Sequence, residues 1–401
     1  MRKLQADKTL LFLVIGLLLF GLIMITSIGV PKSIQLTAPD ILYPNCGDNG
    51  VDCYYLFKNH LIRMLIGIFA MLVVSKIAYR FWKKSAVFIF GATLVLLFLV
   101  LIIGSQFTTF AKSWIVIFNT SLQPTEFAKL ALIFYLAYWF EKKNKEIGTL
   151  QNGFLPFCIV TGIILLPIVL QPDLGSTLVI AGIAVVMYFV AGAKFSHIAL
   201  GALFAGLIAM VLITGVDRVN ERFQAFMNQN ENCREDYCWQ TEQANIAVGT
   251  GGFWGKGLTQ GVQKSFWLPQ ASDDFIFAAS AEELGFLRIF VVVLVYSLIG
   301  YRGYTISANA PDRFSQLTAS GITSWIVIQA FMNISINIGL LPVTGLTLPF
   351  VSYGGSSLVA TLIGVGVLLQ ISKYANTNTP NTNRRGNRRS YNAQLGPYRR
   401  V

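Results

Sequence analysis

Long apolar runs alternate with short polar segments along the whole chain. Ten runs are long and apolar enough to be interpreted as membrane-spanning helices, because a helix needs about 20 mostly apolar residues to cross hydrocarbon. They are 10–29, 61–78, 86–104, 124–140, 154–170, 174–192, 196–215, 274–300, 316–338 and 353–372. Three of them, 124–140, 154–170 and 174–192, have polar ends and are the least regular. The pattern predicts an all-α, polytopic membrane protein with about ten transmembrane helices.

Composition and charge support this class and orient it. The chain is 54% hydrophobic and only 12% charged, against about 25% charged residues in soluble domains. Lys and Arg concentrate at the N-terminus, at 76–84, at 142–145 and after 372. Because such excesses mark cytoplasmic segments, we expect cytoplasmic termini and one large extracytoplasmic loop, about 216–273. The net charge of +12 then follows from this bias, without a nucleic-acid partner.

The chain divides into a membrane domain, 1–373, and a polar basic tail, 374–401, which we expect to be disordered.

Four of the five cysteines fall in predicted outer loops. Cys46 and Cys53 fall in the first outer loop, and Cys233 and Cys238 fall in the large one. Two close pairs in an oxidising compartment suit two disulfides. The alternative is a zinc site of all four thiolates, which requires the two loops to meet.

Ionisable residues in or beside apolar runs are the candidate functional groups, since charge near lipid is costly. Glu126 and Lys129 lie three residues apart at the start of a predicted helix, so they share one face. They form either a functional site or a buried structural pair. Asp173, in QPDLGST, either caps the helix that follows or lines a cavity, and capping is the simpler interpretation.

The stretch LPQASDDFIFAASAEELGF (268–286) carries four carboxylates. At a helical rise of about 1.5 Å per residue, Asp274 and Glu282 would be roughly 12 Å apart, too far for one acid–base pair. The four therefore divide into a pair at the helix mouth, Asp273 and Asp274, and a deeper structural pair, Glu282 and Glu283. Arg288 is the predicted partner of the deeper pair.

Two loops are candidates for the surroundings of a site. Residues 239–270 are Gly-rich and aromatic, as in segments that lie on a membrane surface. The loop 339–357 is rich in Pro and Gly, and irregular backbone at membrane depth is tolerated where it lines a cavity. We expect Ser352, Gly354 and Ser356 of this loop to contact substrate. Its LPVTG also fits a cell-wall anchoring signal, but such signals follow a secreted domain rather than nine helices.

Five motifs occur in order: QPTEFAKL, QPDLGST, GTGGFWGKGL, LPQASDDFIFAASAEELGF and LLPVTGLTLPFVSYGGSS. Together they resemble the SEDS family of peptidoglycan glycosyltransferases, which includes FtsW, RodA and SpoVE, over nearly the whole chain. The segments 7–27 and 309–334 resemble the FtsW branch more than RodA. The resemblance implies that the chain polymerises lipid II, the undecaprenyl-diphosphate-linked disaccharide peptide, at the outer face of the bacterial cytoplasmic membrane.

The resemblance also implies roles for individual residues. The essential acid of the family precedes Phe, which makes Asp274 the catalytic base, and the family's E-x-x-K falls on Glu126 and Lys129. Glycosyl transfer from a diphosphate needs a base for the acceptor hydroxyl and positive charge for the leaving group. Lys129 or a divalent cation, Mg²⁺ or Mn²⁺, would supply that charge, with Asp273 and Asp274 as possible metal ligands.

Several positions depart from the family pattern. Asp273 replaces a Thr, and two neighbouring carboxylates repel, which raises one pKa or favours a bound cation. Ser113 replaces an Arg, and Asn59 and His60 replace an Arg-Gln pair. If those arginines hold phosphate in relatives, other groups must do so here. Lys112, Lys58 and Lys264 are candidates, and Asp273 joins them as a predicted substrate contact.

The resemblance predicts a class B penicillin-binding protein as transpeptidase partner, other division proteins, and a place at the division septum. One alternative is a RodA-type enzyme of cell elongation. Another is a flippase or transporter of lipid II, which would carry charged residues through the full membrane thickness, whereas here they gather on the outer side. A third is a scaffold for division proteins with little catalytic activity. The presence of Asp274, Glu126 and Lys129 argues against it.

Overall fold

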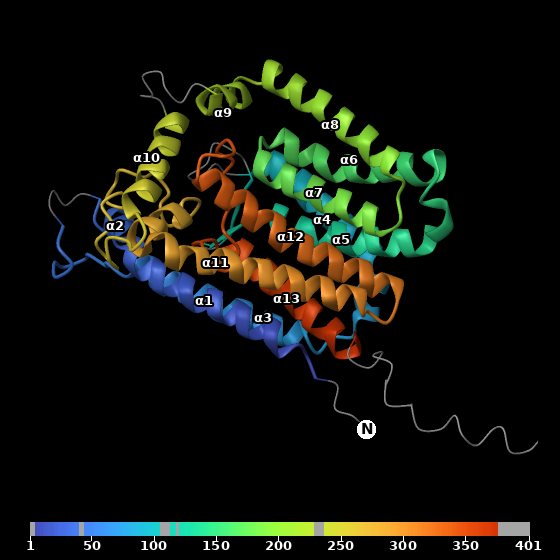
Figure 1. The fold of residues 1–401 in the computed structure, drawn as a ribbon, viewed down its shortest axis with the longest axis horizontal. Coiled ribbons are helices and arrows are strands. Elements are labelled where there is room, and N and C mark those ends of the chain that lie inside the picture. Colours follow the sequence, from blue (N-terminus) through green and yellow to red (C-terminus); the bar gives the residue numbers. More distant parts are fainter. Residues whose placement is uncertain (1–4, 40–43, 105–112, 118–119, 228–235, 376–401) are drawn as a thin grey trace, which may run out of the picture.

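The computed structural model is a bundle of long helices (Figure 1). It describes residues 5–39, 44–104, 113–117, 120–227 and 236–375. The helices are α1 (Lys8–Ile28), α2 (Val30–Thr37), α3 (Tyr55–Val74), α4 (Tyr79–Ile103), α5 (Pro124–Lys143), α6 (Leu155–Leu170), α7 (Leu174–Val190), α8 (Phe195–Gly215), α9 (Asp217–Met227), α10 (Asp236–Gly251), α11 (Ile276–Ala308), α12 (Arg313–Asn337) and α13 (Gly355–Ala375). A short antiparallel hairpin, β1 (Ile115–Ile117) and β2 (Thr120–Leu122), precedes α5.

The predicted all-α membrane class is confirmed, and each of the ten predicted runs overlaps one long helix. Seven helices in the described ranges are long and apolar enough to cross a membrane: α1, α3, α4, α6 with the turn before it, α11, α12 and α13. Among the others, α7 has 17 residues and α5 carries charged residues at both ends. A total of ten spans therefore stays a prediction.

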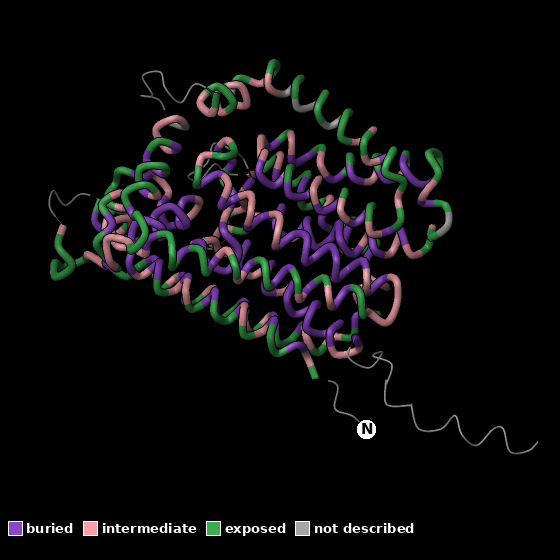
Figure 2. Tube along the Cα trace, in the orientation of Figure 1, coloured by how far each residue is buried: buried purple, intermediate pink, exposed green. Residues whose placement is uncertain are grey.

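The core lies where α12 and α13 pack among their neighbours. α12 contacts α5, α7 and α11, and α13 contacts α3. Both helices are buried on most faces and lie within the purple centre of the bundle (Figure 2). By contrast, α3, α4 and α11 expose large apolar side chains such as Phe69, Phe88 and Val291. Such a one-sided apolar surface on an outer helix is suited to lipid.

The two ends of the described chain meet at one end of the bundle. The Asp7 amide donates to Ser372 Oγ over 2.9 Å, and Arg302, near the end of α11, forms an ion pair with Asp7. This arrangement agrees with termini on one side of the membrane. The opposite end holds α2, α10 and the start of α11 (Figure 1), where the predicted site residues lie.

α11 is interrupted at Gly285, so the prediction of one continuous helix over 274–300 is wrong. Gly285 has φ +78°, and a Cβ there would lie 2.2 Å from the backbone nitrogen of Gly255. The turn after α10 crosses the break, because the amide of Phe286 donates to the Gly252 carbonyl over 2.8 Å. Residues 276–283 are buried, whereas the exposed apolar face begins at Phe286. Glu282 and Glu283 thus lie inside protein, and Asp273 and Asp274, just before α11, are partly buried.

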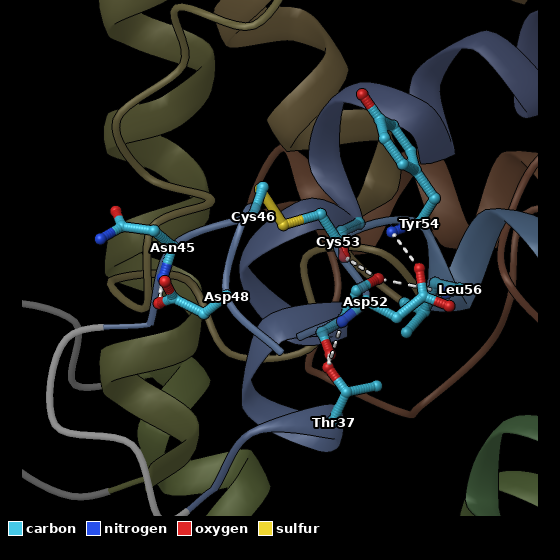
Figure 3. Close-up of a disulfide and its surroundings, with 10 residues drawn as sticks. Thr37, Asn45, Cys46, Asp48, Asp52, Cys53, Tyr54 and Leu56 are labelled. Atoms are coloured by element: carbon cyan, nitrogen blue, oxygen red, sulfur yellow. Dashed lines mark hydrogen bonds between the residues drawn. A yellow bond between two sulfur atoms is a disulfide. The ribbon is translucent and has the colours of Figure 1, made fainter. Parts of the chain in front are cut away.

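Cys46 and Cys53 form a disulfide with Cα atoms 5.6 Å apart, which confirms that predicted pair. The closed loop is held against α2, since the amide of Asp52 donates to Thr37 Oγ1 over 3.0 Å (Figure 3). The four-cysteine zinc site is therefore wrong, because bonded sulfurs are not thiolate ligands. Cys238 is also disulfide-bonded, while its predicted partner Cys233 lies outside the described residues. Cys158 is a free, exposed thiol.

Replacing Cys46 and Cys53 together by Ser should lower the melting temperature of the purified protein. The disulfide closes a short loop, and the lost restriction of the unfolded chain corresponds to about 2–3 kcal/mol. Cys158→Ser is the matched control, since that thiol has no bond to lose. Mass spectrometry without reductant should find the Cys46–Cys53 peptide pair, and free thiols at both positions would contradict this assignment.

Candidate active site at the mouth of α11

Two asparagines of α12 hold the backbone of Asp274 in place. The side-chain amides of Asn333 and Asn337 donate to the Asp274 carbonyl over 2.8 and 2.9 Å. Asn337 also accepts from the amide of Ala278 over 2.9 Å. Because the two asparagines lie one turn apart on a packed helix, the turn that carries Asp274 is fixed without engaging the Asp274 carboxylate.

The neighbouring side chain, Asp273, is fully engaged. Its Oδ2 lies 2.6 Å from Lys32 Nζ, and its Oδ1 accepts from Ser272 Oγ over 2.9 Å. The predicted loop 339–357 reaches the same segment, since the Ser352 hydroxyl donates to the Asp273 carbonyl and the amide of Tyr353 donates to the Ser272 carbonyl over 3.0 Å. Lys32 thus balances the charge of Asp273.

The Asp274 carboxylate stands apart from these contacts. It is half-buried, and no hydrogen bond to it occurs within the described part of the chain. It precedes α11 and so lies outside that span. The pKa of Asp274 is raised to about 7, chiefly by burial and then by the charge of Asp273, while Lys32 and Arg222 oppose the shift. A carboxylate of this pKa is suited to accept a proton near neutral pH.

Glu126 and Lys129 form the predicted pair on α5, and both are buried. Lys129 Nζ lies 2.7 Å from Glu126 Oε1, donates to Gln329 Oε1 over 2.9 Å, and lies 5.5 Å from the Trp325 ring centre. Glu126 Oε2 is buried with no hydrogen-bond partner among the described residues. These contacts agree with the interpretation of Glu126 and Lys129 as a buried structural pair. The second carboxylate oxygen of Glu126 can still accept a hydrogen bond.

Asp173 links this pair to the mouth of α11. Its Oδ1 accepts from the amide of Ser176 over 3.0 Å, so it caps α7 as predicted. Burial raises the pKa of Asp173, an effect opposed by Lys129 and increased by Glu126. Asp173 in turn contributes to the raised pKa of Asp274. The ends of α5, α7 and α11 therefore share one charged region.

Glu282 and Glu283 are structural, as predicted, but their predicted partner is wrong. Glu282 pairs with Lys256 over 2.7 Å and Glu283 with Lys264 over 2.6 Å. Arg288 is exposed and donates instead to the Trp254 carbonyl over 2.9 Å. Gly285 turns the chain between the two acids and Arg288, so the lysines of the segment 256–264 reach the acids first.

This pairing also corrects the prediction for Lys264. Its side chain is 8% exposed and contacts Glu283 and Ser27, so it has no charge to offer to a diphosphate. Lys112 lies outside the described residues. Ser356 Oγ accepts from the amide of Gln123 over 3.0 Å, and Gly354 lies beside Thr347. The substrate contacts predicted for Ser352, Gly354 and Ser356 stay predictions.

Of the two predicted metal ligands, Asp273 and Asp274, Asp273 is poorly placed to bind a divalent cation. Both carboxylate oxygens of Asp273 already have partners, Lys32 and Ser272, and no group of three or more potential ligands occurs in the described ranges. Mg²⁺ is often bound by one or two carboxylates together with substrate phosphates, so Asp274 alone could serve. The cation stays a prediction, and no step below depends on it.

Sequence reasoning missed Lys32, Asn333, Asn337 and Gln329. The three amides lie on one face of α12 at spacings of four residues, and polar residues repeated at helical spacing in an apolar run are a recognisable sign of burial against protein. Lys32 follows the first apolar run directly and resembles an ordinary flanking lysine. Only the tertiary contact distinguishes it.

Together, these features define a polytopic membrane protein with an acidic site at one end of its helices. The FtsW/RodA/SpoVE family, described as cell cycle proteins, matches residues 8–377. The chain belongs to this family.

Relatives and solved structures agree with this assignment. The protein named "Probable peptidoglycan glycosyltransferase FtsW" of Trichlorobacter lovleyi is 37% identical over 92% of this chain and 94% of its own length. Stage V sporulation protein E of Bacillus subtilis is 37% identical over 93% and 99%. A chain of a peptidoglycan synthase complex is 26% identical over 92% and 98%, with a TM-score of 0.73. RodA of Thermus thermophilus, also 26% identical, covers 92% and 96% with a TM-score of 0.64.

Lys129→Ala should strongly destabilise the fold, because it leaves Glu126 buried without its counter-charge, at a cost of about 3–5 kcal/mol. Lys143→Ala removes a pair of the same spacing, Lys143–Glu146, at an exposed position and should cost less than about 1 kcal/mol. Thermal unfolding in detergent measures both. Equal losses of stability in the two variants would show that the buried pair contributes no more to the free energy of unfolding than the exposed pair.

Asp274 should titrate with a midpoint near 7 instead of its ordinary 3.8. Asp273→Asn should lower that midpoint, because it removes a negative charge that disfavours ionisation. Infrared spectroscopy of the protonated carboxyl band, with Asp274→Asn subtracted, measures the titration. Asp48→Asn, in the exposed disulfide loop, should leave the midpoint unchanged. A wild-type midpoint near 3.8 would contradict the assigned environment.

Proposed function

We propose that this protein is a peptidoglycan glycosyltransferase that polymerises lipid II at the outer face of the bacterial cytoplasmic membrane. One observation carries the proposal. The backbone carbonyl of Asp274 is held by Asn333 and Asn337 at the mouth of α11, whereas its side-chain carboxylate is half-buried and has no hydrogen-bond partner among the described residues. The names of relatives such as that of Trichlorobacter lovleyi support the same activity. The helices that are long and apolar enough to cross a membrane support this proposal, because a lipid-linked substrate is also held in a membrane.

In the proposed reaction, Asp274 accepts the proton of an acceptor sugar hydroxyl. That oxygen attacks the anomeric carbon of the donor, the new glycosidic bond forms, and the carbon–oxygen bond to the diphosphate breaks. The products are a longer glycan and undecaprenyl diphosphate. Proton acceptance by a residue whose pKa lies near ambient pH is efficient general-base catalysis.

The diphosphate leaves with negative charge, which positive side chains stabilise. Lys129 is fully buried and contacts Glu126 and Gln329, so we assign it an indirect role: it holds the Glu126 side chain in place near Asp173. Arg222 of α9 is close enough to Asp274 to oppose its raised pKa. We therefore propose Arg222 as a source of positive charge at the diphosphate.

Septal synthesis during cell division is the proposed physiological role, because several relatives are named FtsW. A class B penicillin-binding protein is the proposed partner, in keeping with the peptidoglycan synthase complex of similar fold. Other division proteins and a position at the septum are part of the same proposal. The elongation role rests on the likeness to RodA, and fluorescence microscopy of the tagged protein separates the two.

The test is polymerisation of labelled lipid II by the full-length protein with its transpeptidase partner. Wild type should form glycan chains, and Asp274→Ala should reduce the rate by about 100-fold or more, since general-base catalysis contributes 10²–10⁴-fold. Asp48→Asn is the control acid outside the site. Undiminished chains from Asp274→Ala would refute the assigned base, and none from wild type would refute the proposed activity.

A further inference from the structure

Lys32 is an unusual lysine because both of its contacts lie far away in sequence. It extends from α2 to the segment before α11, where its Nζ lies 2.6 Å from Asp273 Oδ2 and 2.8 Å from Gln270 Oε1. The two ionised side chains are only 25% and 17% exposed. An interaction at this depth is screened less by water than a surface ion pair.

α2 gives this lysine a fixed origin. The helix begins directly after α1, with Pro31 in its first turn. Ser33 Oγ accepts from the amide of Leu56 over 3.1 Å, and Thr37 Oγ1 accepts from the amide of Asp52 in the disulfide-closed loop (Figure 3). Both contacts tie α2 to the start of α3. Lys32 therefore projects from a held element and not from a free loop.

The consequence for the site follows from comparing two neighbouring carboxylates. The Asp273 side chain accepts from Lys32 and Ser272, whereas no hydrogen bond to the Asp274 side chain occurs in the described ranges. Were Lys32 absent, Asp273 would carry an uncompensated charge next to Asp274, and like charges repel. Asp273 would then be free to leave its present rotamer.

We propose that Lys32 is a positioning residue: by binding Asp273 it fixes that carboxylate away from Asp274 and keeps the Asp274 carboxylate free for the substrate. The inference rests on the proposed function, since it concerns the residue assigned as base. Lys32 and Asp273 act as a unit, so Lys32 is needed only while Asp273 is present.

The unit predicts a specific pattern in a double-mutant cycle of lipid II polymerisation. Lys32→Met should lower kcat by about 10- to 100-fold with little change in KM, as expected for a misplaced reacting group. Asp273→Thr should lower kcat less than Lys32→Met does, because it removes the charge that Lys32 restrains. The double variant Lys32→Met with Asp273→Thr should recover to the level of Asp273→Thr alone. Lys32→Arg, which keeps the charge, should restore most of the rate.

Lys83→Met is the matched control. It breaks an ion pair with Glu141 of the same 2.6 Å length and similar exposure, remote from Asp274, and should leave kcat unchanged. A double variant as slow as Lys32→Met would overturn the proposal, because Lys32 would then act independently of Asp273. A raised KM at unchanged kcat would also overturn it, by indicating direct substrate binding.

Thermal unfolding of the same variants keeps this proposal separable from the proposed function. The ion pair predicts that the melting temperatures of the two single variants are coupled, whether or not the chain polymerises lipid II. Coupled melting in a protein that makes no glycan would refute the function. Coupled melting in an active protein whose kcat effects are merely additive would refute the role of Lys32.

Discussion

A carboxylate removed from water needs a compensating charge or hydrogen bonds, and this requirement organises the outer end of the bundle. Glu126 pairs with Lys129, Glu282 with Lys256, and Glu283 with Lys264. The last two pairs join the segment 256–264 to α11, whereas Glu126 and Lys129 lie within one turn of α5. Asp274 is the exception, because its surroundings grip its carbonyl and leave its side chain available. Lysines thus pair with the acids that hold the fold, whereas the Asp274 carboxylate has no such partner among the described residues.

The Gly-rich segment after α10 owes its conformation to the same requirement. The backbone amides of Val262 and Gln263 donate to Glu282, each over 3.0 Å, in addition to the lysine. Such close approach is possible because Gly255 and Gly285 carry no side chains where the two segments cross. A motif that resembles a flexible loop in sequence is therefore the covering of a buried acidic pair.

Much of this arrangement could be predicted from sequence, because its signals are local. Apolar run length identified the long helices, Pro124 marked the start of α5, and the spacing of Glu126 and Lys129 placed them on one face. The partners of Glu282 and Glu283 could not be predicted, because pairing depends on how the chain turns at Gly285. Lys32 was missed for the same reason: its contact with Asp273 joins positions 241 residues apart. Ion pairs between distant segments produce no periodic pattern in the sequence from which they could be predicted.

The polar character of the two central helices has a consequence for how the protein enters its membrane. α12 and α13 are rich in Ser, Thr and Gly, and their buried faces meet protein instead of lipid. Insertion of an isolated helix is less favourable the more polar it is. The contacts that offset this cost come from α3, α5, α7 and α11, all of which precede them in the chain. The helices synthesised last are therefore solvated by those synthesised first, and the growing bundle serves as their solvent in place of the bilayer.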